Sequence, residues 1–169
     1  MQQKVRWGII GLGSIAHHFV KDLLLVNDAQ LIAVASRNIV KAEEFSKEYR
    51  AKYAFGSYEE LFRCEEVDVI YIATPHSFHA VNAIEAMNYG KNILCEKPLG
   101  VNYSEVSKML DAAKKNKVFL MEALWSRFNP TIQKVLQLIQ DDVIGAIKYV
   151  HADFAFPALH RDESNRLLN

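Results

Sequence analysis

Short apolar runs alternate with amphipathic segments through most of the 169 residues, and this alternation restricts the fold more than any other feature. A short, nearly continuous apolar run predicts a strand covered on both faces, whereas apolar residues spaced three and four apart predict a helix. The runs lie at residues 4–10, 29–36, 52–55, 67–73, 91–96 and 117–122. Strands that alternate with helices predict an α/β protein with a doubly wound parallel sheet.

The segments between these runs predict helices with defined inward faces. In residues 14–26 the predicted inward face consists of Ile15, Phe19, Leu23 and Val26. A second helix is predicted through Ala42, Phe45 and Tyr49, and the inward face of residues 102–116 consists of Val106, Met109, Leu110 and Ala113. Ser57 and Glu60 predict a capping box at the start of a small helix, and Gly90 predicts the end of another.

The alternation of apolar runs and amphipathic segments ends after residue 121. Residues 129–142 predict a helix, and residues 144–157 alternate as a strand would, with no later strand to pair with. We therefore expect two domains, a sheet domain over residues 1–121 and the incomplete beginning of a second domain over residues 122–169.

Composition excludes several classes of partner. The chain has 20 basic and 20 acidic residues, so its zero net charge favours neither nucleic acid nor a membrane surface. No apolar stretch approaches the ~20 residues that span a bilayer, and the N-terminus lacks the pattern of a signal peptide. Cys64 and Cys95 have no metal or redox spacing and are interpreted as structural thiols. These observations predict a cytoplasmic protein.

A G-x-G-x-x-A pattern, made by Gly11, Gly13 and Ala16, follows the first predicted strand and opens the first helix. The first glycine permits a tight turn, the second lets the backbone approach a pyrophosphate, and the small third residue allows helix–strand packing. The N-terminus of the helix then offers N–H groups to the phosphates. A purely structural turn is the alternative, but the strand–turn–helix context favours dinucleotide binding.

The residues after the second predicted strand favour NADP(H) over NAD(H). NAD-binding chains place an acidic residue there for the ribose 2′-hydroxyl. Here Ser36 and Arg37 occupy that place, with Lys41 one turn later, and Asp28 lies at the wrong end of the strand. A guanidinium and a hydroxyl suit a 2′-phosphate. A solvent-exposed arginine without a ligand is the alternative. The missing acid also argues against an S-adenosylmethionine methyltransferase.

Two further motifs follow the strands at 67–73 and 91–96. In the first, Thr74 and Pro75 end the strand, and His76 and His79 open the next helix. A metal site is one interpretation of the histidine pair, but no carboxylate or cysteine completes it locally, so we predict no metal. In the second motif, Lys97 follows a buried strand, and partial desolvation would lower its pKa and suit it to proton transfer to a carbonyl. Glu96 would orient it or contact the cofactor ribose. An ordinary surface lysine at the end of a strand is the alternative.

Taken together, "GLGSIA", "ATPHSFHA" and "EKPLG" resemble the Gfo/Idh/MocA oxidoreductase family, and "MEALWSRFNP" (121–130) resembles its branch of dihydrodiol dehydrogenases and glucose–fructose oxidoreductases. The resemblance implies an N-terminal Rossmann domain and a C-terminal domain with a mostly antiparallel sheet, which holds the substrate pocket and often dimerises. The expected partners are a carbohydrate-like or diol substrate and a second copy of the chain.

The resemblance also implies a role for each motif residue. Lys97 would be the catalytic acid and base, as well as a cofactor contact. The other implied cofactor contacts are Gly11, Leu12, Gly13, Ser14, Ile15, Ser36, Arg37, Lys41, Thr74, Pro75, His76, His79, Glu96, Trp125 and Arg127. A tyrosine or histidine that partners the lysine would lie beyond residue 169, which predicts that this chain alone is inactive but still binds cofactor.

Two functions are therefore carried forward. The first is an NADP(H)-dependent oxidoreductase that transfers hydride between nicotinamide and a sugar-like or diol hydroxyl or carbonyl group. The second is a non-catalytic dinucleotide-binding sensor or regulatory module. Lys97 discriminates between them, because a sensor needs the phosphate-binding turn but no proton donor.

Overall fold

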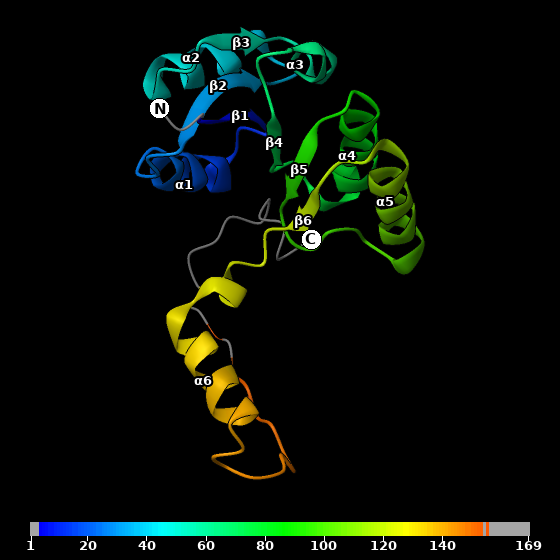
Figure 1. Ribbon diagram of the computed structural model, residues 1–169. Helices are drawn as coiled ribbons and strands as arrows, with labels where there is room; N and C mark the ends of the chain where they lie inside the picture. Colours follow the sequence, from blue (N-terminus) through cyan, green and yellow to red (C-terminus); the bar gives the residue numbers. More distant parts are fainter. Residues whose placement is uncertain (1–3, 154, 156–169) are drawn as a thin grey trace. The chain divides into compact units, whose positions relative to one another are not determined.

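The computed structural model describes residues 4–153 and 155, and the chain divides into two compact units between Leu124 and Trp125. The first unit contains a six-stranded parallel sheet with the strand order β3-β2-β1-β4-β5-β6 (Figure 1). The strands are β1 (Val5–Ile10), β2 (Ala29–Ala35), β3 (Tyr53–Phe55), β4 (Val69–Ile72), β5 (Asn92–Cys95) and β6 (Leu120–Glu122). The order reverses between β1 and β4, so the predicted doubly wound sheet is confirmed.

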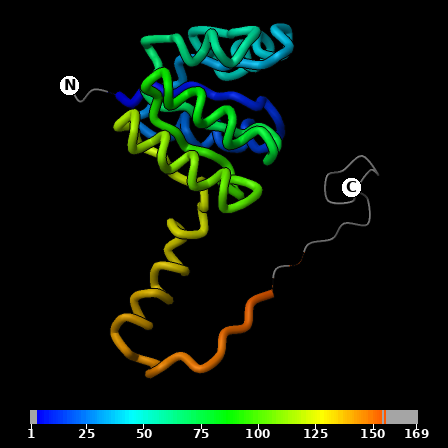
Figure 2. Tube along the Cα trace, turned by 90° about the vertical axis from the view of Figure 1, so that its right-hand side faces the viewer, coloured from blue at the N-terminus to red at the C-terminus, as the bar shows by residue number. Residues whose placement is uncertain are grey.

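Helices cover both faces of this sheet. On one face, α1 (Ser14–Leu23) and α2 (Ile39–Tyr49) pack against strand residues such as Ile9 and Val34. On the other face, α3 (Tyr58–Arg63), α4 (His79–Asn88) and α5 (Tyr103–Asn116) pack against residues such as Ile10 and Ile72. Figure 2 shows α4 and α5 side by side, and the Asn116 side chain donates to Asn88 Oδ1 between them (3.1 Å). Residues that alternate along each strand therefore build two cores.

Several local predictions are confirmed. The Ser57 hydroxyl accepts the Glu60 N–H (3.3 Å) and Glu60 Oε2 accepts the Ser57 N–H (2.9 Å), which is the expected capping box of α3. Gly90 follows α4 with a φ of +75°, a conformation that suits glycine at the end of a helix. The second predicted helix is α2, and Ala42, Phe45 and Tyr49 are all buried.

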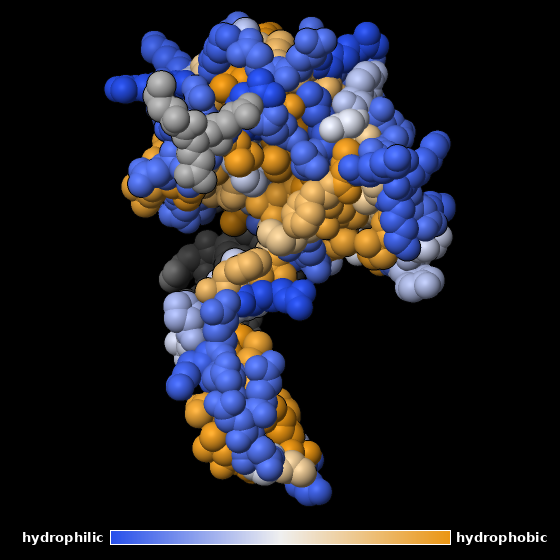
Figure 3. All heavy atoms as spheres, in the orientation of Figure 1, coloured by the Kyte–Doolittle hydropathy of each residue, from blue (hydrophilic) through white to orange (hydrophobic). Residues whose placement is uncertain are grey.

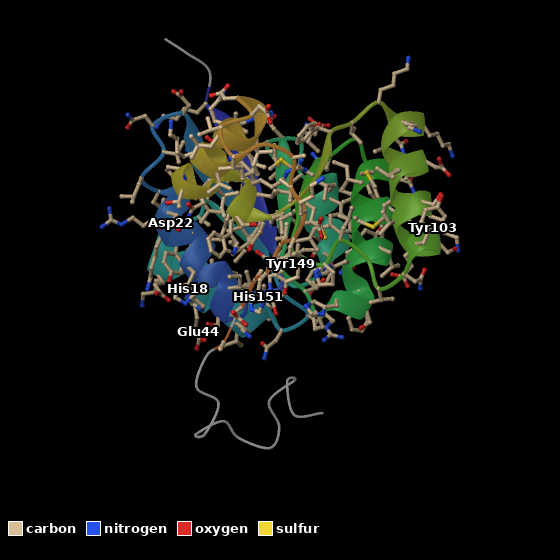
Figure 4. The ribbon with its side chains drawn as sticks, turned by 90° about the horizontal axis from the view of Figure 1, so that it is seen from below. His18, Asp22, Glu44, Tyr103, Tyr149 and His151 are labelled. Atoms are coloured by element: carbon tan, nitrogen blue, oxygen red, sulfur yellow. The ribbon has the colours of Figure 1, made fainter. Side chains whose placement is uncertain are left out.

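Two predicted helix faces are partly wrong. The inward face of α1 consists of Ala16, Val20 and Leu23, and the predicted Phe19 packs against the same core, whereas Ile15 is 44% exposed and Val26 lies beyond the end of the helix and is 53% exposed. His18 and Asp22 mark the outward side of α1 in Figure 4. In α5, Met109 and Ala113 are buried but Leu110 is 46% exposed. Because aliphatic residues occupy two sides of each helix, their spacing alone did not identify the buried one.

The second unit contains a short 3₁₀ helix, η2 (Trp125–Phe128), and α6 (Pro130–Gln140), which confirms the helix predicted over residues 129–142. Asn129 caps α6 by accepting the Thr131 N–H at 2.9 Å. No residue of α6 is buried, and its apolar residues Ile132, Val135 and Leu136 are each at least 43% exposed. Figure 3 shows apolar side chains at the surface of this unit beside a stripe of polar ones.

The strand predicted over residues 144–157 is not found in its described part, residues 144–153 and 155; the remainder lies outside the described residues. A strand is stabilised by hydrogen bonds to a neighbouring strand, and the described residues of this unit supply no such neighbour. Side chains two residues apart instead contact one another: Tyr149 Oη lies 3.2 Å from His151 Nδ1, and both are labelled in Figure 4. In the described part of the chain, no helix is long and apolar enough to cross a bilayer.

Candidate functional site

The register of the sheet brings the sequence motifs to one edge. The last residues of the six strands lie in one row across the ladder, in the order Phe55, Ala35, Ile10, Ile72, Cys95 and Glu122. Ser36, Gly11 and Glu96 each directly follow a residue of this row, and Thr74 lies two residues beyond Ile72. Ligands of open α/β sheets bind beyond the carboxyl ends of the strands, so this edge is the candidate site.

The turn after β1 requires glycine at its first position. Gly11 has a φ of +81°, and a Cβ atom there would lie 2.4 Å from the backbone of Ala73 and of Thr74. No side chain can be accommodated so close to the backbone that follows β4. Gly11 therefore lets the β1 turn pass directly beside the end of β4.

Gly13 leaves space where Gly11 does not. A Cβ atom at Gly13 would meet no atom within 4 Å. Gly13 is also the N-cap of α1 and has no side chain that could accept the first N–H groups of the helix. The N–H groups of Ser14 and Ile15 thus face an open surface suited to an anion, and buried Ala16 allows α1 to pack closely on the sheet.

Beyond β2, the chain presents Ser36, Arg37 and Lys41. The Ser36 hydroxyl accepts the Asn38 N–H (3.2 Å), and Asn38 in turn caps α2 by accepting the Val40 N–H (3.0 Å). Arg37 and Lys41 are exposed, and among the described residues neither forms an ion pair with a carboxylate. The two cations therefore remain available for an anionic ligand.

Arg37 connects the β2 turn with the motif after β4. Its Cζ atom lies 5.9 Å from the centroid of the Phe78 ring, in η1 (His76–Phe78). Burial raises the pKa of Tyr58 while the charge of Arg37 opposes that shift, which places this cation within electrostatic reach of the start of α3. Phe78 was not singled out in the sequence, because nothing in "HSFHA" identifies an arginine partner.

His79 is fully buried and contacts the backbone on both sides of its ring. Its Nε2 lies 2.9 Å from the Thr74 carbonyl oxygen and its Nδ1 lies 2.8 Å from the Pro98 carbonyl oxygen. The ring thus links the loop after β4 to the loop after β5. The His76 ring lies edge-on to it, with centroids 5.5 Å apart. Among the described residues, no group of three or more His, Cys, Asp or Glu residues is arranged to hold a metal ion.

Glu96 is held by two donors. The Tyr71 hydroxyl donates to Oε1 (2.7 Å), and the Lys97 N–H donates to Oε2 (3.2 Å). Burial and this hydrogen bond raise the pKa of Tyr71, and its ring stacks on Phe19 of α1 with centroids 3.8 Å apart. Tyr71 was missed in the sequence because a tyrosine within an apolar strand is an ordinary core residue.

Lys97 lies next to a cis peptide bond with Pro98. The sequence predicts a partly desolvated lysine, but Lys97 is exposed, as is Pro98 after it, because both lie beyond the end of β5. In contrast, Cys95, two residues before Lys97, is buried, and burial raises the pKa of its thiol to about 12. Cys95 is therefore a core thiol, and Lys97 is the residue of this turn that can meet a ligand.

Trp125 and Arg127 belong to η2 in the second unit. Both side chains are exposed, and the Arg127 carbonyl oxygen accepts a hydrogen bond from the Gln133 amide at 3.2 Å. Their implied contacts with cofactor stay predictions.

The phosphate-suited turn, the doubly wound sheet and the polar residues that follow its strands at the carboxyl edge together define a dinucleotide-binding protein. Residues 5–124 match the family model described as "Oxidoreductase family, NAD-binding Rossmann fold", and the chain belongs to this family, Gfo/Idh/MocA. The family resemblance drawn from the sequence motifs is therefore confirmed.

The curated relatives are similar to nearly the whole chain. Trans-1,2-dihydrobenzene-1,2-diol dehydrogenase from Danio rerio is 43% identical over 152 residues, which cover 89% of this chain and 46% of that protein. The Homo sapiens enzyme of the same name is 37% identical over 158 residues, which cover 92% of this chain and 47% of that protein. The chain thus spans about half the length of the curated relatives it matches.

Solved structures give the same fold. A mutant 3-ketoreductase from Actinomadura kijaniata, in complex with TDP-benzene and NADP, is 26% identical and superposes with a TM-score of 0.80. The match covers 86% of this chain and 46% of that one. Apo scyllo-inositol dehydrogenase from Lactobacillus casei also has a TM-score of 0.80, at 22% identity, over 86% of this chain and 44% of that one, and this likeness concerns the fold alone.

Proposed function

We propose that this chain is the cofactor-binding half of an NADP(H)-dependent oxidoreductase that acts on a diol or a sugar-like substrate. The observation that supports this most is the arrangement at the carboxyl edge of the sheet. There the Gly11–Gly13 turn lies between Arg37, which has no ion pair among the described residues, and the Lys97 turn. A phosphate-binding turn, a cation for a further phosphate and a proton donor are what such a reaction requires.

NADP fits the residues of this edge. The pyrophosphate would lie over Gly13, against the backbone of Leu12, Ser14 and Ile15. Leu12 would contribute through its backbone, since its side chain is buried. The 2′-phosphate would be held by Ser36, Arg37 and Lys41, whose charge and hydroxyl complement it. NADP in the 3-ketoreductase complex adds support for the phosphorylated cofactor.

The nicotinamide would lie towards the loops after β4 and β5. Thr74, Pro75 and His76 would line it, and His79 would act through the carbonyl groups it contacts. Glu96, held by Tyr71, would contact the cofactor ribose. From the second unit, Trp125 and Arg127 would flank the nicotinamide and the pyrophosphate.

NADP(H), when bound, supplies or accepts a hydride at the nicotinamide ring. Lys97 is the acid and base of the proposed reaction. In reduction its ammonium group donates a proton to the substrate carbonyl oxygen, and in oxidation its amine removes the proton of the substrate hydroxyl. Glu96 accepts the Lys97 backbone N–H and so fixes the residue that carries the reacting group.

The rest of the enzyme is proposed from the family resemblance. Residues 122–169 would begin a second domain that carries the substrate pocket, a second catalytic tyrosine or histidine, and a surface for a homodimer. The dihydrodiol named in the curated relatives supports a diol substrate, and the 3-ketoreductase supports a substrate with a carbonyl group.

The decisive experiment combines binding and turnover. NADPH and NADH are titrated into this chain and followed by nicotinamide fluorescence, and the full-length protein is assayed with NADP(H) on dihydrodiols and sugars. We expect tighter binding of NADPH than of NADH, and turnover that Lys97→Ala abolishes. Binding without any turnover, and without an effect of Lys97→Ala, would favour the non-catalytic sensor instead.

A further inference from the structure

Backbone groups of three consecutive residues at the Lys97 turn, Lys97, Pro98 and Leu99, are each held by a side chain from a different part of the first unit. The Lys97 N–H donates to Glu96 Oε2 (3.2 Å), at the end of β5. The Pro98 carbonyl oxygen lies 2.8 Å from His79 Nδ1, on α4. The Leu99 N–H donates to Glu122 Oε1 (2.8 Å), at the end of β6. The turn is therefore fixed from three sides.

Each of the three residues that supply these side chains is itself fixed. Glu96 accepts the Tyr71 hydroxyl, and His79 also contacts the Thr74 carbonyl oxygen. Glu122 pairs with Cys95 in the parallel ladder, and the Ala123 N–H donates to the Cys95 carbonyl oxygen at 2.7 Å. The backbone of the turn is thus connected to β4, β5 and β6 at once.

We propose that Glu122 is a positioning residue for Lys97. The Lys97 side chain is exposed and forms no ion pair among the described residues. Only the backbone of the turn therefore determines the position from which this side chain extends. Glu122 holds the N–H group of Leu99, two residues after Lys97. It therefore fixes the direction in which Lys97 leaves the sheet. A misplacement of about 1 Å can cost a reaction about 100-fold. This inference rests on the proposed role of Lys97 as proton donor.

The contact between Glu122 and the Leu99 N–H is not needed to start α5, the helix that follows the turn. Asn102 caps α5 by accepting the Glu105 N–H (3.0 Å), and Glu105 Oε2 accepts the Val101 N–H (3.2 Å). The Glu105–Val101 contact has the same chemistry as the Glu122–Leu99 contact, but it lies four residues from Lys97 rather than two. Glu105 therefore supplies a matched control.

The test compares two substitutions of similar size in the full-length protein. Glu122→Met removes the acceptor, whereas Glu122→Gln keeps an oxygen that can accept the Leu99 N–H. We expect Glu122→Met to lower kcat by about 10- to 100-fold with little change in KM, and Glu122→Gln to stay within about threefold of the parent. Glu105→Ala should leave kcat unchanged. Faster amide hydrogen exchange at Leu99 in Glu122→Met alone would report the loss of the contact directly.

The outcomes separate this inference from the proposed function. If Lys97→Ala abolishes turnover but Glu122→Met leaves kcat unchanged, the inference fails and the proposed function stands. Equal losses of kcat in Glu122→Met and Glu122→Gln, or in Glu122→Met and Glu105→Ala, would also overturn it. If Lys97→Ala leaves turnover intact, the proposed function itself fails. Glu122→Ala serves as a second non-accepting variant should Glu122→Met not fold.

Discussion

Charged side chains at the two edges of the sheet have different partners. At the amino edge they pair with one another: Arg6 Nε donates to Asp68 Oδ2 (2.9 Å), and Lys52 Nζ lies 2.7 Å from both carboxylate oxygens of Glu66. The buried Lys91 ammonium donates to two carbonyl oxygens at the same edge, those of Cys64 and Val67. The charges of Arg6, Asp68, Lys52, Glu66 and Lys91 are therefore satisfied within the fold.

At the carboxyl edge the charges are kept apart. The carboxylates of Glu96 and Glu122 accept backbone N–H groups, and the cations Arg37, Lys41 and Lys97 have no carboxylate partner among the described residues. These paired side chains of the amino edge therefore stabilise the fold, whereas the cations of the carboxyl edge are available to a ligand. Substitutions at the two edges should therefore affect different measurements.

The largest expected effect is a loss of kcat when Lys97 is replaced. Lys97→Met in the full-length protein should lower kcat by about 10²- to 10⁴-fold, because a positioned proton donor contributes that much to a rate. Lys52→Met is the matched control at the amino edge, where it removes a lysine paired with Glu66. Steady-state kinetics of both variants measure the difference, and similar losses of kcat in the two would contradict the assignment.

The next effect concerns cofactor preference. Arg37→Asp should weaken NADPH binding by about 10- to 150-fold while NADH binding changes much less, because a hydrogen bond to a charged group contributes about 1.5–3 kcal/mol. Arg50→Asp, at an exposed arginine after the last turn of α2, is the control. Fluorescence titration with both cofactors measures the ratio. An unchanged preference in Arg37→Asp would remove the support for NADP.

A smaller effect is expected at Tyr71. Tyr71→Phe keeps the stack on Phe19 but releases Glu96, and it should weaken NADPH binding by about 3- to 10-fold, a fraction of what a hydrogen bond to a charged group contributes. Tyr53→Phe is matched to it, since the Tyr53 hydroxyl donates to Glu66 Oε1 (2.6 Å) at the amino edge. The same titration compares the two variants, and equal weakening by both would argue against a role for Glu96 in binding.

The smallest effect is on stability at the amino edge. The hydrogen bond from Arg6 lowers the pKa of Asp68 below its ordinary value. The stabilisation is then fully present above the unfolded pKa of about 3.9 and is lost as pH falls through the lower native pKa. Asp68→Asn should lower Tm by about 2–4 °C at pH 7. In thermal unfolding this difference should disappear at low pH, and NADPH affinity should not change.

Most of the first unit could be predicted from the sequence, because its signals are local. The apolar runs identified the strands, and Ser57 with Glu60 identified the start of α3. Gly11 was predicted for a tight turn, and the structure adds the neighbour that requires it, the backbone of Ala73 and Thr74.

The missed features depend on contacts between distant parts of the chain. Glu122 meets a backbone N–H group 23 residues earlier, and the ring of Phe78 meets a guanidinium 41 positions before it. No spacing rule connects such pairs. The strand predicted over residues 144–157 failed in its described part for a related reason, since a local alternation cannot supply the neighbouring strand it needs.

The cap of α2 has a consequence for how this protein can change over evolution. Asn38 alone supplies the side-chain cap of the helix, and Arg37 next to it makes no hydrogen bond that the helix requires. Residue 37 is therefore free to vary without disturbing the folding of its neighbours. On the proposed role of Arg37 at the 2′-phosphate, a lineage carrying this scaffold would exchange one coenzyme for another through single mutations there, and protein engineers can begin at the same position.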